Sequence, residues 1–150
     1  METLDLSLQT QIVFLFRIVV AGALGAIIGY ERQREFKPAQ LRDYILVCVG
    51  ACLFAVVGLA LGGTTDASRV VSTVVTGVGF LGAGVILRQG RTVRGITTAA
   101  SIWAVAAIGV SVGIGLYLLA AATTLGVFLV LWFMEEVAPP EGGSDSEPGR

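Results

Sequence analysis

The sequence contains no histidine and few charged residues of either sign. Histidine is the side chain that most readily changes charge near neutral pH, and it is a preferred metal ligand. Without it we predict that the chain is not an enzyme, has no catalytic residues and holds no resident cofactor. Charged residues make up 14% of the chain, against about 25% in soluble domains, and hydrophobic residues make up 55%. Such a chain has too little polar surface to fold in water, so the lipid bilayer is its expected surroundings.

Three motif matches carry no chemistry here. The sequence G-x-G-x-x-G at 77–82 lies inside an apolar run, with no acid about 20 residues on, so it is not a dinucleotide site. The G-x-S-x-G match at 109–113 has no histidine to act as base. Cys48 and Cys52 stand four residues apart in an apolar run and are predicted to be buried thiols packed between helices. No basic stripe with interleaved aromatics exists, which excludes nucleic acid as a partner.

Long apolar runs predict an all-α fold, a polytopic bundle of membrane-spanning helices. A span needs roughly 20 apolar residues to cross a hydrocarbon core about 30 Å thick. The stretch 95–134 has no charged residue, and as one helix it would be about 60 Å long, so it must turn back on itself, at the glycines of 109–115. The predicted spans are five, at about 8–30, 41–61, 70–87, 95–110 and 115–134. They form one domain, 1–136, followed by an acidic tail, 137–150, predicted to be disordered.

Lys and Arg are concentrated in two of the predicted loops, 31–42 and 88–94, and are absent from the N-terminal segment. Positive charge accumulates in the cytoplasmic loops of membrane proteins. We therefore predict that both loops are cytoplasmic, that the N-terminus is outside and that the C-terminus is cytoplasmic.

Charges within or beside the spans are the candidate functional residues, because a charge in hydrocarbon is costly. Arg17 lies inside the first span and is expected to pair with an acid, a carbonyl or cavity water. Asp66 is either a helix cap or a cation ligand, and Glu31 is expected in an interfacial ion pair. The remaining charge candidates are Arg42, Arg69, Arg88 and Arg94. The polar residues Thr97, Thr98 and Ser101 are predicted either to line a polar cavity or to hydrogen-bond between helices.

Glycines supply the expected packing surfaces. In lipid, small residues let helix backbones approach closely, and G-x-x-x-G pairs mark such contacts. The predicted helix-packing positions are Gly25, Gly29, Gly77, Gly79, Gly82 and Gly84. Four of these six crowd the third span, which predicts that this span lies at the centre of the bundle.

Several segments together resemble one family. Gly77-Val-Gly-Phe-Leu-Gly-Ala-Gly-Val-Ile86, a basic turn, and Val93-Arg-Gly-Ile-Thr-Thr-Ala-Ala-Ser-Ile-Trp103 are similar to the MgtC/SapB family of bacterial inner-membrane proteins. The segment Leu24-Gly-Ala-Ile-Ile-Gly-Tyr-Glu-Arg32 adds to the likeness. The resemblance implies a multi-pass protein of the cell inner membrane with five spans and an outside N-terminus. It also implies association with growth in low magnesium and with survival inside host cells.

The sequence departs from the family pattern in three places. Many members continue into a cytoplasmic ACT-like domain, so this chain is expected to be a short form that lacks it. Thr73 stands where a glutamine is expected, and Asp43 where a small polar residue is commoner.

The resemblance predicts a role in magnesium homeostasis, in which the chain regulates or accompanies cation transport. One alternative is a self-contained Mg²⁺ transporter, with Asp66 as the candidate metal ligand. Another is an interaction module that binds a second integral membrane protein, such as the ATP synthase. A homo-oligomer is a further candidate assembly.

Overall fold

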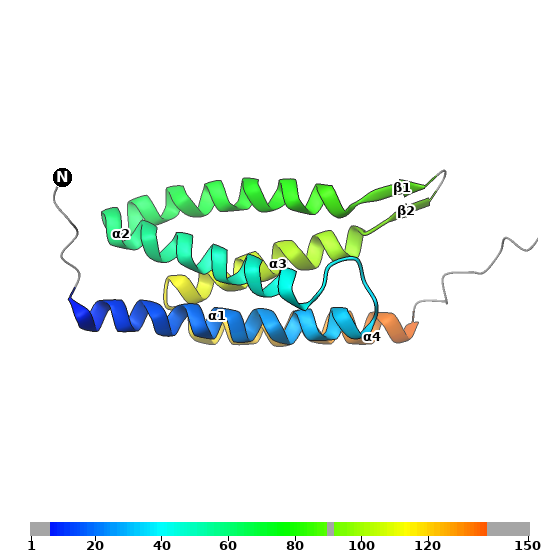
Figure 1. Ribbon diagram of the computed structural model, residues 1–150, viewed down its shortest axis with the longest axis horizontal. Helices are drawn as coiled ribbons and strands as arrows, with labels where there is room; N and C mark the ends of the chain where they lie inside the picture. The colour runs from blue at the N-terminus through cyan, green and yellow to red at the C-terminus, as the bar shows by residue number, and fades with distance from the viewer. Residues whose placement is uncertain (1–6, 90–91, 138–150) are drawn as a thin grey trace, which may run out of the picture.

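The computed structural model describes residues 7–89 and 92–137, so the predicted tail lies outside the described residues apart from Val137. The elements are α1 (Leu8–Arg34), α2 (Leu41–Val85), β1 (Leu87–Gln89), β2 (Thr92–Arg94), α3 (Ile96–Gly113) and α4 (Tyr117–Val137). The helices run along a common axis and form an elongated bundle (Figure 1).

Helix α2 is 45 residues long and doubles back on itself (Figure 1). A straight helix of that length would measure about 68 Å, more than twice the hydrocarbon core. Its two halves form antiparallel legs, here called the first leg (Leu41–Gly62) and the second leg (Thr65–Val85). The legs meet closely near the bend, where a Cβ added to Gly58 would lie 2.8 Å from the Cα of Ala67.

The structure has five helical segments at the five predicted spans. Helix α1, the two legs of α2 and helix α3 are each long and apolar enough to cross a membrane, and Tyr117–Phe133 of α4 is a shorter apolar helix. The residues between the predicted spans 41–61 and 70–87 do not form a loop, because helical structure continues through them.

Strands β1 and β2 pair as an antiparallel β-hairpin that the sequence did not predict. Its register pairs Leu87 with Arg94 and Gln89 with Thr92. Gly95 follows with φ of 90°, and a side chain there would collide with the carbonyl oxygen of Val85. The hairpin therefore replaces the end of the predicted third span and the basic turn after it.

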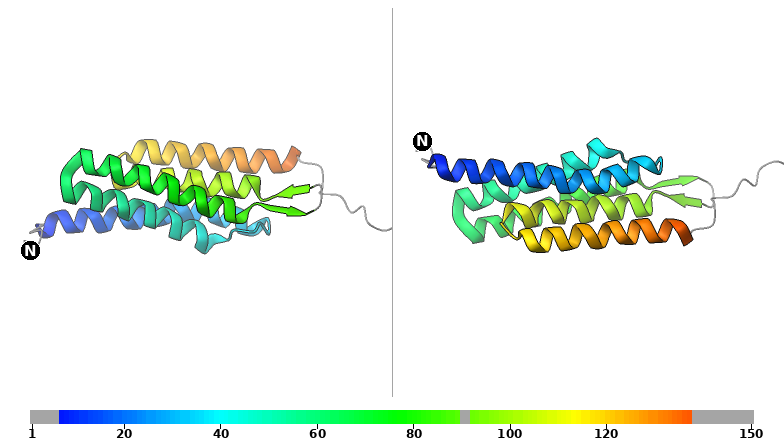
Figure 2. Two further views of the ribbon diagram at one scale, coloured as in Figure 1. Left: turned by 90° about the horizontal axis from the view of Figure 1, so that it is seen from above. Right: turned by 90° about the horizontal axis from the view of Figure 1, so that it is seen from below.

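The two Lys- and Arg-rich segments of the sequence lie at the same end of the bundle. The loop between α1 and α2, the β-hairpin and the described end of α4 lie together at one end, here called the basic end (Figures 1 and 2). The start of α1 and the bend of α2 lie at the other, the opposite end. The two basic loops lie at the same end, as the prediction that both face one side of the membrane requires. Which end faces the cytoplasm stays a prediction from that pattern.

The first leg of α2 packs between α1 and α3. On one side, Gly25 of α1 lies so close that an added Cβ would be 2.8 Å from the Cβ of Cys48. On the other side, a Cβ on Gly113 of α3 would be 2.7 Å from the carbonyl oxygen of Cys52. Both cysteines are buried and free, as predicted. Half of the apolar window of α3 is buried and a third of the first leg's, against about a tenth of the second leg's, so the core lies between α3 and the first leg.

The prediction that the third span is central is wrong. An added Cβ on Gly77, Gly79 or Gly84 would meet no described atom within 4 Å, and one on Gly82 would meet only Ala99 of α3, at 3.6 Å. The second leg packs at the edge of the bundle, so most of its glycines face outward. The predicted packing role holds within the described chain for Gly25 and Gly29 but not for Gly77, Gly79 and Gly84.

Candidate functional site

Arg17 joins α1 to the end of α3. Its Nη1 donates a hydrogen bond of 2.6 Å to the carbonyl oxygen of Gly113, the last residue of α3. The carbonyls in the last turn of a helix have no partner within the helix. Arg17 therefore meets a carbonyl, one of the three partners that the sequence left open.

The turn after α3 explains why this carbonyl is available. Gly115 has φ of 90°, and its N–H bonds the carbonyl of Val112, while the N–H of Leu116 bonds the carbonyl of Ser111 at 2.8 Å. This is a Schellman arrangement, which satisfies two of the last carbonyls. Gly113 then receives its hydrogen bond from Arg17.

The arginine is favourably placed but incompletely bonded. A cation at the C-terminus of a helix interacts well with the partial negative charge there. The guanidinium carbon also lies 5.7 Å from the ring centroid of Phe14, within the range of a cation–π contact. Its Nε, however, is buried and has no hydrogen-bond partner among the described atoms. The guanidinium thus keeps its positive charge beside neutral groups.

A second set of polar side chains is buried toward the basic end, and we call it the polar cluster. It consists of Glu31, Arg32, Tyr44, Thr98 and Ser101. Arg32 is 1% exposed and Glu31 7%, although α1 ends only two residues later. The guanidinium binds the carboxylate with both arms, Nε to Oε2 at 2.6 Å and Nη2 to Oε1 at 2.7 Å. Such fork-to-fork pairing is the strongest geometry that an ion pair takes.

The other half of the polar cluster is a hydrogen-bonded relay between α2 and α3. The Ser101 hydroxyl donates to the carbonyl of Thr98 at 2.9 Å, and the Tyr44 hydroxyl lies 2.7 Å from Ser101 Oγ. Because Ser101 has one proton and gives it to Thr98, Tyr44 is the donor to Ser101. The Tyr44 phenol also lies within electrostatic range of Arg32 and Glu31, which connects the two halves.

Comparison with known proteins identifies the family of this chain. A sequence model described as the MgtC family matches residues 18–139, most of the chain. The chain belongs to the MgtC family. It is 45% identical over 113 residues to Protein MgtC of Brucella abortus (strain 2308), which is 74% of this chain and 48% of that protein. It is 38% identical over 125 residues to Protein MgtC of Salmonella typhimurium (strain LT2), or 83% of this chain and 54% of that protein.

An uncharacterized protein of Synechocystis is 41% identical over 117 residues, 78% of this chain and 49% of that protein. The MgtC-family chain therefore spans about half the length of the curated relatives it matches. No solved structure matches it significantly. Family and fold together make it a multi-pass membrane protein of the MgtC family.

The structure brings some of the predicted site residues together and leaves others apart. Thr98, Ser101 and Glu31 come together in the polar cluster, whereas Thr97 on the same turn of α3 is exposed. Asp66 is half-buried beside the bend of α2, where its carboxylate packs over Gly62. The remaining charge candidates are exposed, namely Arg42, Arg69, Arg88 and Arg94.

Two members of the polar cluster, Arg32 and Tyr44, were missed from the sequence. Tyr44 stands four residues before Cys48, on the face of α2 that the buried cysteines mark. Arg32 stands three residues after Gly29, on the packing face of α1. Helical spacing from the predicted buried positions was the signal that could have found both.

A metal centre does not form among the residues that the structure describes, where no three Asp, Glu or Cys side chains gather. Both carboxylate oxygens of Glu31 are held by Arg32. Asp66 as a Mg²⁺ ligand stays a prediction.

Proposed function

We propose that this chain is an inner-membrane protein of magnesium homeostasis that regulates or accompanies cation transport and does not carry Mg²⁺ by itself. The observation that carries the proposal is the charge of the buried groups. Among the side chains whose burial the structure describes, the one buried carboxylate is that of Glu31, and Arg32 neutralises it. Arg17, which is partly buried and bonded to a neutral carbonyl, adds a positive charge beside the end of α3.

That charge opposes the passage of a cation. Mg²⁺ gives up its water reluctantly and is normally held by one or two carboxylates together with remaining waters. Two unit charges about 4 Å apart interact by about 4 kcal/mol at an effective dielectric constant of about 20. A divalent ion passing close to Arg17 would meet roughly twice that repulsion, and no buried carboxylate in the described residues is free to offset it.

The direct test is Mg²⁺ uptake into sealed liposomes that contain the purified protein and a trapped Mg²⁺-sensitive dye. We expect uptake no faster than in protein-free liposomes, for wild type and for Arg17→Gln alike, with a known Mg²⁺ channel as positive control. Saturable uptake by the wild type would refute the proposal in favour of a self-contained transporter.

A test in cells separates regulation from transport on the positive side. The chain is expressed in two bacterial strains at limiting magnesium, one with its own Mg²⁺ uptake systems and one without them. We expect a change in growth or in cellular Mg²⁺ content only in the first strain. Rescue of the second strain would identify the chain as the carrier.

A further inference from the structure

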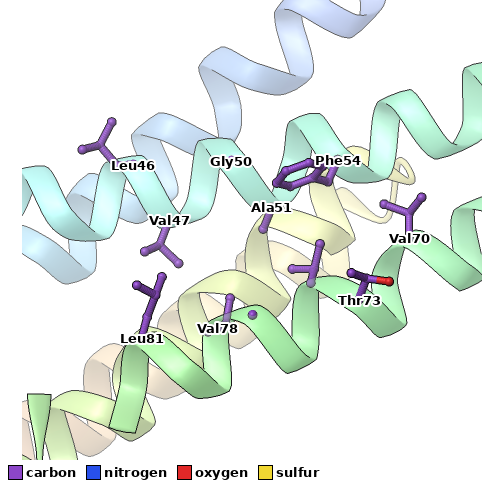
Figure 3. Close-up of a pocket in the computed structure, with 11 residues that line it drawn as sticks. Leu46, Val47, Gly50, Ala51, Phe54, Val70, Thr73, Val78 and Leu81 are labelled. Carbon is purple, nitrogen blue, oxygen red and sulfur yellow. The ribbon is translucent and has the colours of Figure 1, made fainter. Parts of the chain in front are cut away.

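An open groove runs between the two legs of α2 on the outside of the bundle (Figure 3). Its volume is about 660 Å³. Val47, Gly50 and Phe54 line it from the first leg, and Val74, Gly77 and Leu81 line it from the second. The groove belongs to neither of the sites described above.

The residues that line the groove favour an apolar ligand. Thr73 is the one hydroxyl-bearing side chain among the lining residues, and its Oγ1 donates to the carbonyl of Arg69 at 3.2 Å. The side chains of the lining therefore offer no free hydrogen-bond donor to a polar ligand. Gly50 and Gly77 have no described atom within 4 Å of an added Cβ, so they keep the groove open.

The length and volume of the groove match one lipid tail. The lining extends over residues 46–54 of the first leg and 70–81 of the second, which is about 12 Å and about 16 Å along the helices. One leaflet of a hydrocarbon core about 30 Å thick measures about 15 Å. A cavity of about 150 Å³ holds one benzene, so 660 Å³ has room for an acyl chain of about 16 carbons, part of it facing the bilayer.

The cation nearest to the lining along the first leg is Arg42, one helical turn before Leu46. Arg42 lies four residues before the lining residue Leu46, on the same helix face and toward the basic end, and side chains on a helix tilt toward its N-terminus. The Arg42 side chain is 79% exposed, and its Nε lies 3.6 Å from Oδ1 of Asp43. Oδ2 of that carboxylate accepts the N–H of Gln40 at 2.8 Å. An exposed pair this long is weak, so a phosphate that offers two oxygens competes with it well.

We propose that the groove binds one anionic phospholipid of the bilayer, with an acyl chain between the two legs of α2 and its phosphate on Arg42. Basic residues beside grooves between transmembrane helices are suited to anionic headgroups. The proposal commits to a lipid because the groove is apolar, opens on the outside of the bundle and has Arg42 beyond its lining, one helical turn toward the basic end. It does not depend on the role in magnesium homeostasis.

The experiment measures lipid retained by the purified protein. The protein is reconstituted into vesicles of equal parts phosphatidylglycerol and phosphatidylethanolamine, returned to mild detergent and analysed by native mass spectrometry. We expect the wild type to retain one phosphatidylglycerol. A phosphatidylglycerol with a photoreactive acyl chain should label both legs of α2.

The chain offers closely matched variants. Gly77→Leu fills the groove, and Gly79→Leu adds the same side chain two residues away, outside the lining, where space is also open. We expect Gly77→Leu to retain at least tenfold less lipid than Gly79→Leu, and Gly50→Leu to repeat the loss from the first leg. Arg42→Ala should lose the preference for phosphatidylglycerol over phosphatidylethanolamine, while Arg34→Ala, which removes a charge from α1 at the same end, should keep it. Thermal unfolding of each variant shows that it is folded.

Two results would overturn the inference. One is equal lipid retention by folded Gly77→Leu and Gly79→Leu. The other is a dimer in the wild type that Gly77→Leu dissociates, since a second copy of the chain would then occupy the groove.

Discussion

At the scale of single residues, Arg17 has the least usual position. A charged side chain inside an apolar span is stabilised here by one carbonyl and by the C-terminal end of a helix. Its unbonded Nε is a cost that the neighbouring groups do not remove. The net contribution to stability therefore depends on whether the bond to Gly113 outweighs that cost.

We predict that the hydrogen bond from Arg17 to Gly113 outweighs the cost of the unbonded Nε. Arg17→Met should lower the free energy of unfolding by about 1–2 kcal/mol, the range for a hydrogen bond with a charged donor in a membrane interior. Arg17→Lys should recover part of the loss, because it keeps a charged donor. Reversible unfolding in mixed micelles measures both, with the exposed Arg69→Met as control. Equal stability of Arg17→Met and Arg69→Met would show that the contact contributes nothing.

The direction of the Tyr44–Ser101 hydrogen bond gives a second prediction. Ser101→Ala leaves the buried Tyr44 hydroxyl without its acceptor, at a cost of about 1–3 kcal/mol. Tyr44→Phe removes the donor and leaves Ser101 bonded to Thr98, so it should cost less. The double variant should then be more stable than Ser101→Ala alone. The same unfolding assay decides, and a double variant that is less stable than either single one would contradict the assigned direction.

At the scale of elements, two sets of glycines have opposite surroundings. A Cβ on Gly109 of α3 would collide with the carbonyl oxygen of Cys48 and lie 3.1 Å from the Cβ of Ala51. Gly79 on the second leg of α2 faces open space. The first glycine permits helix contact, whereas the second only lowers helix propensity.

Alanine substitution should therefore change stability in opposite directions. Gly109→Ala forces α3 away from the first leg and should destabilise by about 1–3 kcal/mol. Gly79→Ala should stabilise by up to about 1 kcal/mol, because alanine is the better helix former. Melting temperatures of the two variants in one detergent test this, and a shift of the same sign in both would contradict the packing described.

The β-hairpin at 87–94 could not have been predicted from its residues. Each strand has three residues, too few for an alternating pattern to appear. The carbonyl of Val85 and the left-handed Gly95 fix where α2 stops and α3 starts, and both depend on the folded chain.

At the scale of the whole molecule, the sequence predicts the spans well and their arrangement poorly. The lengths of the apolar runs identify the five spans, and the positions of Lys and Arg place both basic loops at one end. Helix faces that meet lipid and faces that meet other helices are equally apolar, so hydropathy does not distinguish them. For this reason the glycines of the second leg suggested a central helix that is in fact peripheral.

The candidate sites were predicted in part. Arg17, Glu31, Thr98 and Ser101 were found because polar residues stand out in apolar runs. Their partners could not be found, because Gly113 acts through its backbone and lies 96 positions from Arg17. The cytoplasmic side stays a prediction, which labelling of single introduced cysteines at the two ends from either side of the membrane would test.

The helices differ in length, and this difference has one more consequence. Helix α1 has 27 residues and is about 40 Å long, whereas α3 has 18 and is about 27 Å long, slightly less than the hydrocarbon core. The turn that follows α3 thus ends short of the far surface, and Arg17 is bonded there. In a thick bilayer this corner would sink into the acyl chains, and in a thin one it would reach water and headgroups. Bilayer thickness should thereby set how well the guanidinium is hydrated, and longer-chain lipids should destabilise the wild type more than Arg17→Met.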